Sequence, residues 1–372
     1  MFLYTPAMNW IPPDFPRHGR AAVSSRTGRF ESLQRAAIDD GWDDGWEDEE
    51  DGGAHPPLRT TVGIDRARRI IATNQSPDVP FDRSINPYQG CEHGCIYCFA
   101  RPTHAYYGLS PGLDFETKLF QKPDAPALLA TELRQPRYRP AVIALGANTD
   151  PYQPIERGLQ LTRRILQVLA DFGHPVAIVT KSPLVTRDID ILAPMAAQNL
   201  AMVTLSVTTL DRRLARCMEP RAATPGRRLD AIRALSAAGI PVSVLAAPMI
   251  PALNDAELEA ILAAAAKAGA CSAGYTLLRL PLEIRDLFVE WLNANYRDRA
   301  SHVMSLVRDT RGGADYDSRW GLRRTGTGAY ADLLATRFRL ARRKFGLDKR
   351  SLDLDLTRFR PPPVKGDQLT LF

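Results

Sequence analysis

Three cysteines stand close together in the segment PYQGCEHGCIYCFARP, residues 87–102, with the spacing C-x3-C-x2-C. They are Cys91, Cys95 and Cys98. Gly90 and Gly94 give the backbone the freedom to wrap three thiolates around one inorganic centre. Structural zinc sites close with four protein ligands, and four-iron clusters normally take four cysteines. A run that stops at three leaves one position at the metal open for a substrate or cofactor.

The residues alone leave other interpretations open. His93 and His104 are near enough in the sequence to complete a zinc site, and a third alternative is that the thiols bind no metal. Cys217 and Cys271 stand alone far downstream, which argues against a second cluster. With three of five cysteines in one loop, a disulfide framework is excluded and a reducing cytoplasm is predicted.

With Tyr97 before its last cysteine, the loop resembles the signature of the radical S-adenosylmethionine (SAM) superfamily. Residues 59–345 are similar to the subgroup related to spore photoproduct lyase, whose members are often described as DNA repair photolyases. Several separated motifs carry this resemblance, which makes it more specific than one pattern. They are SINPYQGCEHGCIYCFARPTHAYYGLSPGLDFETK, ALGANTDPYQPIE, TKSPLVTRDIDIL, MEPRAATP and LRLP.

The resemblance implies a [4Fe-4S] cluster on the three cysteines, whose remaining iron binds the amino and carboxylate groups of SAM. A donor such as flavodoxin or ferredoxin would reduce the cluster, SAM would be cleaved, and a 5′-deoxyadenosyl radical would take a hydrogen atom from the substrate. Spore photoproduct lyase also uses a cysteine just after its second strand, where this chain has Ala147. The thymine-dimer reaction is therefore in doubt. Either Tyr106 or Tyr107 serves as the catalytic donor, or SAM is regenerated differently, or the substrate differs.

Six short apolar segments alternate with helical segments, starting near residues 84, 141, 176, 202, 242 and 275. This alternation predicts an α/β fold with a parallel sheet covered by helices. In the family that the chain resembles, six such units form a partial (β/α)6 TIM-like barrel. One amphipathic helix is expected to carry Ile155, Leu159, Leu166 and Leu169 on one face, and Asn254 with Glu257 predicts a capping box for a helix at 255–268.

The organisation of the chain follows from its composition. We expect a largely disordered, acidic N-terminal tail over 1–58 and the barrel over 59–300. A basic C-terminal helical extension should cover 301–360, with a flexible tail at 361–372. No apolar run is long enough to span a bilayer, and the N-terminus lacks the pattern of a signal peptide, so we expect a soluble cytoplasmic protein.

In barrels of this kind the chemistry sits at the carboxyl ends of the strands, which is where cofactor ligands are sought. The candidates for SAM are Tyr97, Asn148, Thr149, Asp150, Lys181 and Ser206, with Thr208 beside the last of these. A cation such as Lys181 suits the carboxylate of SAM. Glu116 and Lys118 follow the cysteine loop and are further candidates to face the cofactor. The alternative for each residue is an ordinary role at a strand end or on the surface.

Charge points to a polyanionic partner. The formal net charge is +6, although residues 39–51 hold nine acids and no base, so the rest of the chain carries +15. The segment 311–330 interleaves arginines with aromatic residues, as single-strand binders do, and the next helix has a basic face. The candidate phosphate and base contacts are Arg311, Arg319, Arg323, Arg324, Tyr316, Trp320 and Tyr330.

Damaged or modified DNA is therefore the leading substrate hypothesis. The alternatives are an RNA-modifying radical enzyme, or a clamp-associated protein whose cluster is structural or redox-sensing. The chain ends in QLTLF, which resembles the peptide that docks bacterial polymerases and repair enzymes on the DNA sliding clamp. Gln368, Leu369, Leu371 and Phe372 fit that pattern, behind a Pro-rich linker. The alternative is a chain end that packs on its own barrel.

A peptide of residues 364–372 is predicted to bind the sliding clamp of the same cell, because two apolar side chains fill its groove and the glutamine fixes the register. Binding in solution can be measured by fluorescence anisotropy. Phe372→Ala should weaken it by about tenfold or more, as loss of a buried aromatic anchor does. Absence of binding, or binding unchanged by Phe372→Ala, would contradict the prediction.

Overall fold

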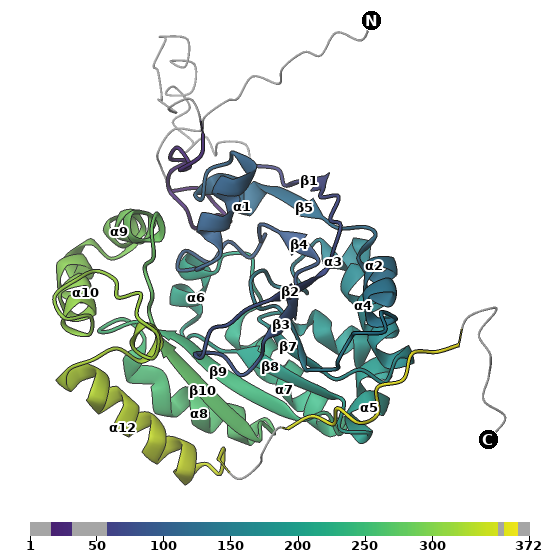
Figure 1. Ribbon diagram of the computed structural model, residues 1–372. Coiled ribbons are helices and arrows are strands. Elements are labelled where there is room, and N and C mark those ends of the chain that lie inside the picture. Colours follow the sequence, from purple (N-terminus) through teal and green to yellow (C-terminus); the bar gives the residue numbers. More distant parts are fainter. Residues whose placement is uncertain (1–15, 32–57, 349–352, 364–372) are drawn as a thin grey trace, which may run out of the picture.

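The computed structural model describes residues 16–31, 58–348 and 353–363 of the 372-residue chain. Its centre is an open seven-stranded sheet in the order β10-β9-β8-β7-β6-β3-β2 (Figure 1). Six neighbouring strands run parallel, and the short edge strand β2 (Ile71–Thr73) is antiparallel to β3. The parallel strands are β3 (Arg83–Ile85), β6 (Ile143–Leu145), β7 (Val176–Thr180), β8 (Ala201–Ser206), β9 (Val242–Met249) and β10 (Ser272–Leu277).

Each parallel strand pairs with the next one along the chain, so the predicted six-unit partial barrel is confirmed. Its helices are α2 (Ala125–Leu133), α4 (Leu161–Asp171), α5 (Ile189–Ala197), α7 (Pro225–Ala237), α8 (Leu258–Lys267) and α9 (Ile284–Asn295). Among the described residues three more helices follow: α10 (Arg297–Asp309), the short α11 (Leu322–Thr325) and α12 (Ala329–Lys344). The α12 helix packs on α8 and on edge strand β10, where the rings of Tyr275 and Phe338 lie 4.6 Å apart. It therefore helps to cover that edge of the sheet.

The helix predicted to run from Ile155 to Leu169 is broken at Gln160, so this prediction is wrong. Gln160 has a φ of 51° and separates α3 (Glu156–Leu159) from α4. The buried carboxylate of Glu156 accepts a hydrogen bond from the backbone N–H of Thr162 at 3.0 Å and pairs with Arg187 at 2.7 Å. This carboxylate thus satisfies an amide of the first turn of α4, which allows the helix to start anew there.

The predicted capping box is also wrong. The amide of Asn254 donates to the carbonyl oxygens of Thr208, at 2.8 Å, and Pro248, at 3.0 Å. Glu257 accepts from the hydroxyl of Thr209 and the backbone N–H of Leu210. Both side chains therefore join the chain around the ends of β8 and β9, and a 3-10 turn (Asp255–Glu257) precedes α8.

A second, three-stranded sheet lies beside the cysteine loop, and the sequence analysis did not anticipate it. In the order β1-β5-β4, it consists of β1 (Thr61–Ile64), β5 (Lys118–Gln121) and β4 (Tyr88–Gln89). The β4 strand leads directly into Cys91, and β5 follows the short helix α1 (Leu113–Thr117). This small sheet fixes both ends of the segment that contains the three cysteines.

Residues 16–31, here called the N-terminal arm, pack against the barrel, which corrects the expectation of a disordered tail for this part of 1–58. Ala21, Ala22 and Ser24 are buried. Arg20 donates to the carbonyl oxygens of Leu58 and Glu116, each at 2.7 Å. The acidic run at 39–51 lies outside the described residues.

One buried ion pair joins this arm to the cysteine loop. Arg101 and Glu116 are both fully buried, and their charged groups are 2.5 Å apart. The backbone N–H groups of Ala21 and Ala22 donate to the Glu116 carboxylate at 3.2 and 3.0 Å. The Arg101 guanidinium also donates to four carbonyl oxygens, those of Gly94, Cys95, Pro111 and Gly112. Loop, α1 and arm therefore meet at this pair.

Arg101→Gln should lower the free energy of unfolding by about 3–5 kcal/mol, because it leaves the Glu116 carboxylate buried without its charge partner. Urea denaturation under anaerobic conditions measures the change. Arg233→Gln is the matched control, since Arg233 forms an exposed pair with Asp230 and its loss should cost about 0.5 kcal/mol or less. Equal unfolding midpoints for the two variants would refute the structural role given to Arg101.

A buried histidine makes the stability of the fold depend on pH. His174 precedes β7; its Nε2 is 2.7 Å from the hydroxyl of Tyr138, and its Nδ1 is 3.0 Å from the carbonyl oxygen of Pro175. The ring of Phe359 packs edge-on against it. Burial lowers the pKa of His174 from 6.5 to about 4, so the imidazole is neutral in the folded protein.

As the pH falls from 6.5 to 4, His174 becomes protonated in the unfolded chain but stays neutral in the folded protein. Its contribution to stability is therefore complete above pH 6.5 and declines by up to about 3 kcal/mol toward pH 4. His174→Asn should flatten the slope of unfolding free energy against pH in this window. Urea titrations at several pH values test this, and an unchanged slope would show that other groups cause the acid sensitivity.

Candidate metal centre and cofactor site

The three cysteines lie in a tight loop after β4. Cys91 and Cys95 are each 7% exposed, and burial raises the pKa of all three thiols. Backbone N–H groups oppose this effect, since Asp150 hydrogen-bonds Cys91, and Ala100 and Arg101 hydrogen-bond Cys98. Such bonds stabilise thiolates, the form that binds iron.

The two loop glycines are required by their surroundings. Gly90 and Gly94 have φ values of 72° and 66°, which residues other than glycine rarely adopt. A Cβ atom at Gly94 would lie 2.7 Å from the Glu116 carboxylate, and one at Gly90 would lie 2.7 Å from Leu119. The predicted role of both glycines in wrapping the loop is therefore confirmed.

The ligands fit a cluster better than a single zinc ion. His93 directs Nδ1 toward the Asp150 carboxylate at 3.3 Å, and His104 places Nε2 2.9 Å from the carbonyl oxygen of Lys118. Burial lowers the pKa of His104 to about 4. Within the described ranges, no three His, Cys, Asp or Glu side chains are grouped to hold one metal ion. A cluster gives each of three irons one thiolate, so its ligands need not converge on a single point.

A positive charge also lies near the thiols. Lys181 follows β7, lowers the pKa of Cys95 and Cys98, and places its ammonium 5.6 Å from the centre of the Tyr97 ring. The structure therefore brings the predicted Lys181 to the cysteine loop, beside Tyr97. An ammonium here offsets the negative charge of the thiolates and offers a partner to an anionic cofactor group.

Asp150 joins the ends of β6 and β7. Its carboxylate accepts hydrogen bonds from the hydroxyl of Thr180 at 2.7 Å, and from the backbone N–H groups of Lys181 at 2.8 Å and Tyr152 at 2.9 Å. Burial alone would raise its pKa, but the neighbouring His93 and the hydrogen bonds from Thr180 and Lys181 lower the pKa of Asp150 to about 2. Asp150 therefore positions Lys181 and His93 as a permanent anion.

The other strand-end candidates make contacts within the protein. Thr149 donates its hydroxyl to the carbonyl oxygen of Tyr88 at 2.8 Å, and the backbone N–H of Asn148 donates to the side chain of Asn86 at 3.0 Å. Both contacts link the end of β6 to the chain before the cysteine loop. Ser206 is buried at the end of β8, where its carbonyl oxygen accepts from Arg228 at 3.1 Å. Cofactor contact by Asn148, Thr149 and Ser206 stays a prediction.

The structure does not bring the two candidate hydrogen donors to the cysteines. Tyr106 is 72% exposed and stacks on Phe30, with ring centres 5.3 Å apart. Tyr107 donates to Asp65 at 2.9 Å and stacks on Phe120 in the small sheet. Both belong to the 3-10 helix Arg101–Tyr107, and their catalytic role stays a prediction that these contacts do not support.

Two further expectations concern the C-terminal part. Gln368, Leu369, Leu371 and Phe372 lie outside the described residues. In the segment 311–330, three arginines bind within the chain and are not free to meet phosphates, which corrects that hypothesis. Arg311 donates to the carbonyl oxygens of Leu278 and Leu322, Arg323 pairs with Asp78, and Arg324 donates to Thr276.

Sequence reasoning missed a buried carboxylate that holds Tyr97. Glu219 accepts from the hydroxyls of Tyr97 and Thr208 and pairs with the buried Arg228. Glu219 directly follows α6 (Arg212–Met218), Arg228 lies near the start of α7, and the segment MEPRAATP contains Glu219. This motif carried part of the family resemblance, so it was the available signal. Glu219 fixes the aromatic ring next to the cluster ligands.

Likewise, Glu116 was named as a residue that could face the cofactor. It is instead the fully buried partner of Arg101. Lys118 is the first residue of β5, and its ammonium pairs with the carboxylate of Asp114 at 3.0 Å.

Comparison with known proteins places this arrangement in a family. Residues 85–265 match the radical SAM superfamily. An uncharacterized protein from Mycobacterium tuberculosis is 39% identical over 242 residues, which cover 64% of this chain and 71% of that protein. Another from Methanocaldococcus jannaschii is 30% identical over 192 residues, 52% of this chain and 69% of the relative.

Solved structures of spore photoproduct lyase have the same fold. One variant covers 77% of this chain and 79% of its own, with a TM-score of 0.55 and 16% identity. Another, with bound SAM and dinucleoside spore photoproduct, covers 76% and 78%, with a TM-score of 0.53 and 16% identity. The cluster and SAM are the family's cofactors, and the three cysteines, the barrel and the sequence match agree: this chain belongs to the radical SAM superfamily.

Proposed function

We propose that this radical SAM enzyme acts on nucleic acid, with a damaged or modified base in DNA as its target. The observation that carries the proposal is a set of exposed arginines on α6. They are Arg212, Arg213 and Arg216, and none of them pairs with a carboxylate in the part of the chain that the structure describes. Unpaired guanidinium groups on one short helix suit the phosphates of a nucleic acid backbone.

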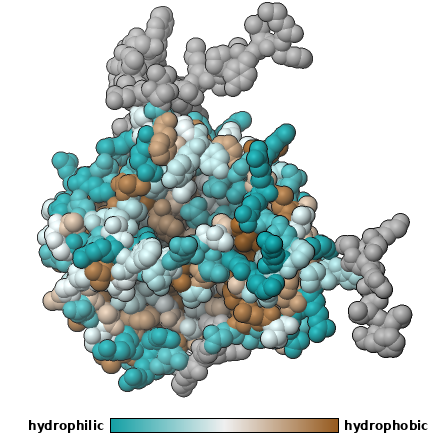
Figure 2. All heavy atoms as spheres, in the orientation of Figure 1, coloured by the Kyte–Doolittle hydropathy of each residue, from teal (hydrophilic) through white to brown (hydrophobic). Residues whose placement is uncertain are grey.

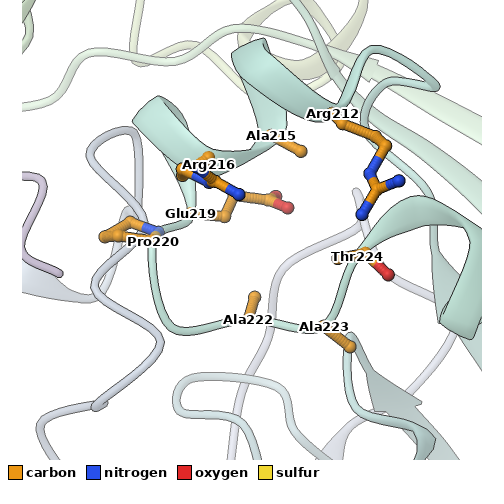
Figure 3. Close-up of a pocket in the computed structure, with 8 residues that line it drawn as sticks. All are labelled: Arg212, Ala215, Arg216, Glu219, Pro220, Ala222, Ala223 and Thr224. Carbon is orange, nitrogen blue, oxygen red and sulfur yellow. The ribbon is translucent and has the colours of Figure 1, made fainter.

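A small pocket lies beside these arginines (Figure 3). It has a volume of about 80 Å³ and is bounded by α6 and by the loop that leads into α7. Arg212 extends from α6 toward Thr224 across the pocket, and Arg216 lies near Glu219. The Glu219 carboxylate also lines this pocket, but it is already paired with Arg228. The two arginines beside a hollow of this size therefore favour a phosphate-sized anion.

A larger cavity of about 480 Å³ adjoins the other side of Arg216. It lies between the N-terminal arm, α6 and α9. Arg17, His18 and Arg20 contribute to its wall from the arm. In Figure 2, hydrophilic side chains cover much of the molecular face, with apolar patches between them. Basic groups therefore border two adjacent hollows, as expected for a surface that follows a polyanion.

This surface is connected to the cysteine loop. The backbone N–H of Ile96 donates to the carbonyl oxygen of Met218 at 3.0 Å, and Arg221 pairs with Glu92 at 2.7 Å. A nucleic acid held on α6 therefore lies next to the loop that binds the cluster. No described helix is long and apolar enough to cross a membrane.

In this proposal the chain positions the cofactor and the substrate. Cys91, Cys95 and Cys98 would hold the cluster, and Lys181 would pair with the carboxylate of SAM. When bound, the reduced cluster would supply one electron to cleave SAM, and the resulting radical would take a hydrogen atom from the substrate. Glu219 keeps Tyr97 in place beside the ligands.

The target base must leave the stack to reach the cysteine loop, as it does in other enzymes that act on bases. The solved spore photoproduct lyase with its dinucleoside photoproduct supports a DNA lesion as the substrate class. Ala147 stands after β6 where that enzyme is expected to have its thiol, so the proposal is repair or modification of a base without the same hydrogen donor.

The test is anaerobic reconstitution of the cluster, followed by dithionite, SAM and either ultraviolet-irradiated DNA, intact DNA or RNA. We expect irradiated or modified DNA to stimulate formation of 5′-deoxyadenosine, and Cys95→Ala to abolish it. The Arg212→Gln/Arg216→Gln variant should bind single-stranded oligonucleotides about tenfold more weakly. Its salt slope should fall by roughly 0.7 for each phosphate that the variant no longer binds.

Arg233→Gln serves as the control, because Arg233 is an exposed arginine already paired with Asp230. Cleavage of SAM that no nucleic acid alters, with no binding of DNA or RNA at low salt, would refute the proposed substrate class. Stimulation by RNA alone would replace DNA with RNA.

A further inference from the structure

Arg279 is a cation next to the cysteine loop that the described part of the chain leaves without a counter-ion. It follows β10, and its guanidinium lies over the ring of Phe99, 5.5 Å from the ring centre. Phe99 comes directly after Cys98, the last cluster ligand, and stays 48% exposed. This pair therefore joins the end of the last parallel strand to the cluster loop.

The Nε atom of Arg279 is buried and has no hydrogen-bond partner within the described residues. No carboxylate in that part of the chain forms an ion pair with Arg279, and its neighbours Leu278 and Leu280 are buried. A polar atom removed from water without a partner costs about 1–3 kcal/mol, so this arrangement favours a ligand that restores the bond.

Two further guanidinium groups lie close to it. Arg279 lowers the pKa of both Arg311 and Arg324, after the larger effect of burial. Arg311 donates to the carbonyl oxygens of Leu278 and Leu322, and Arg324 donates to the carbonyl oxygen of Asp78 and the hydroxyl of Thr276. Both guanidinium groups thus donate to neutral acceptors. The carboxylates of Asp317 and Asp78 offset part of the charge of Arg311 and Arg324, but neither forms an ion pair with Arg279 in the described residues, so an anion beside Arg279 would be stabilised.

We propose that Arg279 and Phe99 form the site for the target nucleotide: Arg279 binds its phosphate and the exposed ring of Phe99 stacks on a base. This inference rests on the proposed function and specifies where that substrate sits. A guanidinium beside an aromatic ring matches the two parts of a nucleotide, its phosphate and its base. Placement next to Cys98 brings the nucleotide to the edge of the cluster.

The carboxylate of SAM is the other anion that this site could take. Lys181 already lies near Cys95 and Cys98 and over the ring of Tyr97, so a cation for that carboxylate is present after the central strand β7, whereas Arg279 follows the edge strand β10. A nucleotide phosphate and the SAM carboxylate can be distinguished, because only the second would make SAM binding depend on Arg279.

The experiment uses the full chain with a reconstituted cluster and a fluorescent single-stranded oligonucleotide. Arg279→Gln should weaken its binding by about tenfold and lower the salt slope by roughly 0.7, the value for one phosphate. Phe99→Leu should weaken binding by a similar factor and leave the salt slope unchanged, because stacking is not ionic. Arg279→Lys should retain most of the salt slope.

The dissociation constant for SAM is the second readout. If Arg279 paired with the SAM carboxylate, Arg279→Gln would weaken SAM binding and leave oligonucleotide binding unchanged. That result would overturn the inference, and so would variants that bind both ligands as the wild type does. Arg233→Gln controls for removal of one positive charge elsewhere on the protein. Iron content and circular dichroism show whether each variant is folded and loaded.

The outcomes also separate this inference from the proposed function. If the wild type binds the oligonucleotide and the Arg279 and Phe99 variants bind it equally well, this site alone is refuted. Wild-type protein that binds no nucleic acid would refute both.

Discussion

Holding three thiols in one loop, two of them buried and one partly buried, is the constraint on which this structure depends. Thiolates repel one another and lose hydration when buried, so their loop needs support from several directions. Arg101 binds loop carbonyl oxygens, Cys91 donates its backbone N–H to Phe115 in α1, and Ile96 donates to Met218 in α6. The amide of Asp150 reaches Cys91 from the end of β6. The small sheet, α1, α6 and the barrel thus share the task of fixing one loop.

Buried ion pairs perform much of this positioning. Arg101 with Glu116, and Arg228 with Glu219, lie on two sides of the loop and are almost fully removed from water. Such pairs contribute little net stability compared with apolar residues, but each group has few alternative partners once buried. They therefore specify the geometry of the loop, and Glu116 extends this order to the N-terminal arm, which has no helix or strand among its described residues.

The sequence predicted what local patterns determine. The six parallel strands start within a few residues of the predicted positions. Short, continuous apolar segments between helices are typical of strands buried on both faces of a parallel sheet. The cysteine spacing and two glycines likewise identified the loop. Gln160, which interrupts a helix of regular periodicity, could not be found this way, because the buried Glu156 that starts the next helix acts through tertiary contacts with Tyr88 and Arg187.

The arginines show most clearly why charge counts need a structure. Arg311, Arg323 and Arg324 have the composition of a nucleic acid contact, yet they hold their segment against the barrel. Arg212, Arg216 and Arg279 are equally ordinary in the sequence, yet the described chain gives them no counter-ion. A guanidinium with internal partners must give them up before it binds a phosphate, whereas an unpaired one gives up only water. Arg279, which lies over Phe99 directly after Cys98, is therefore one positive charge that remains available to a substrate beside the cysteine loop.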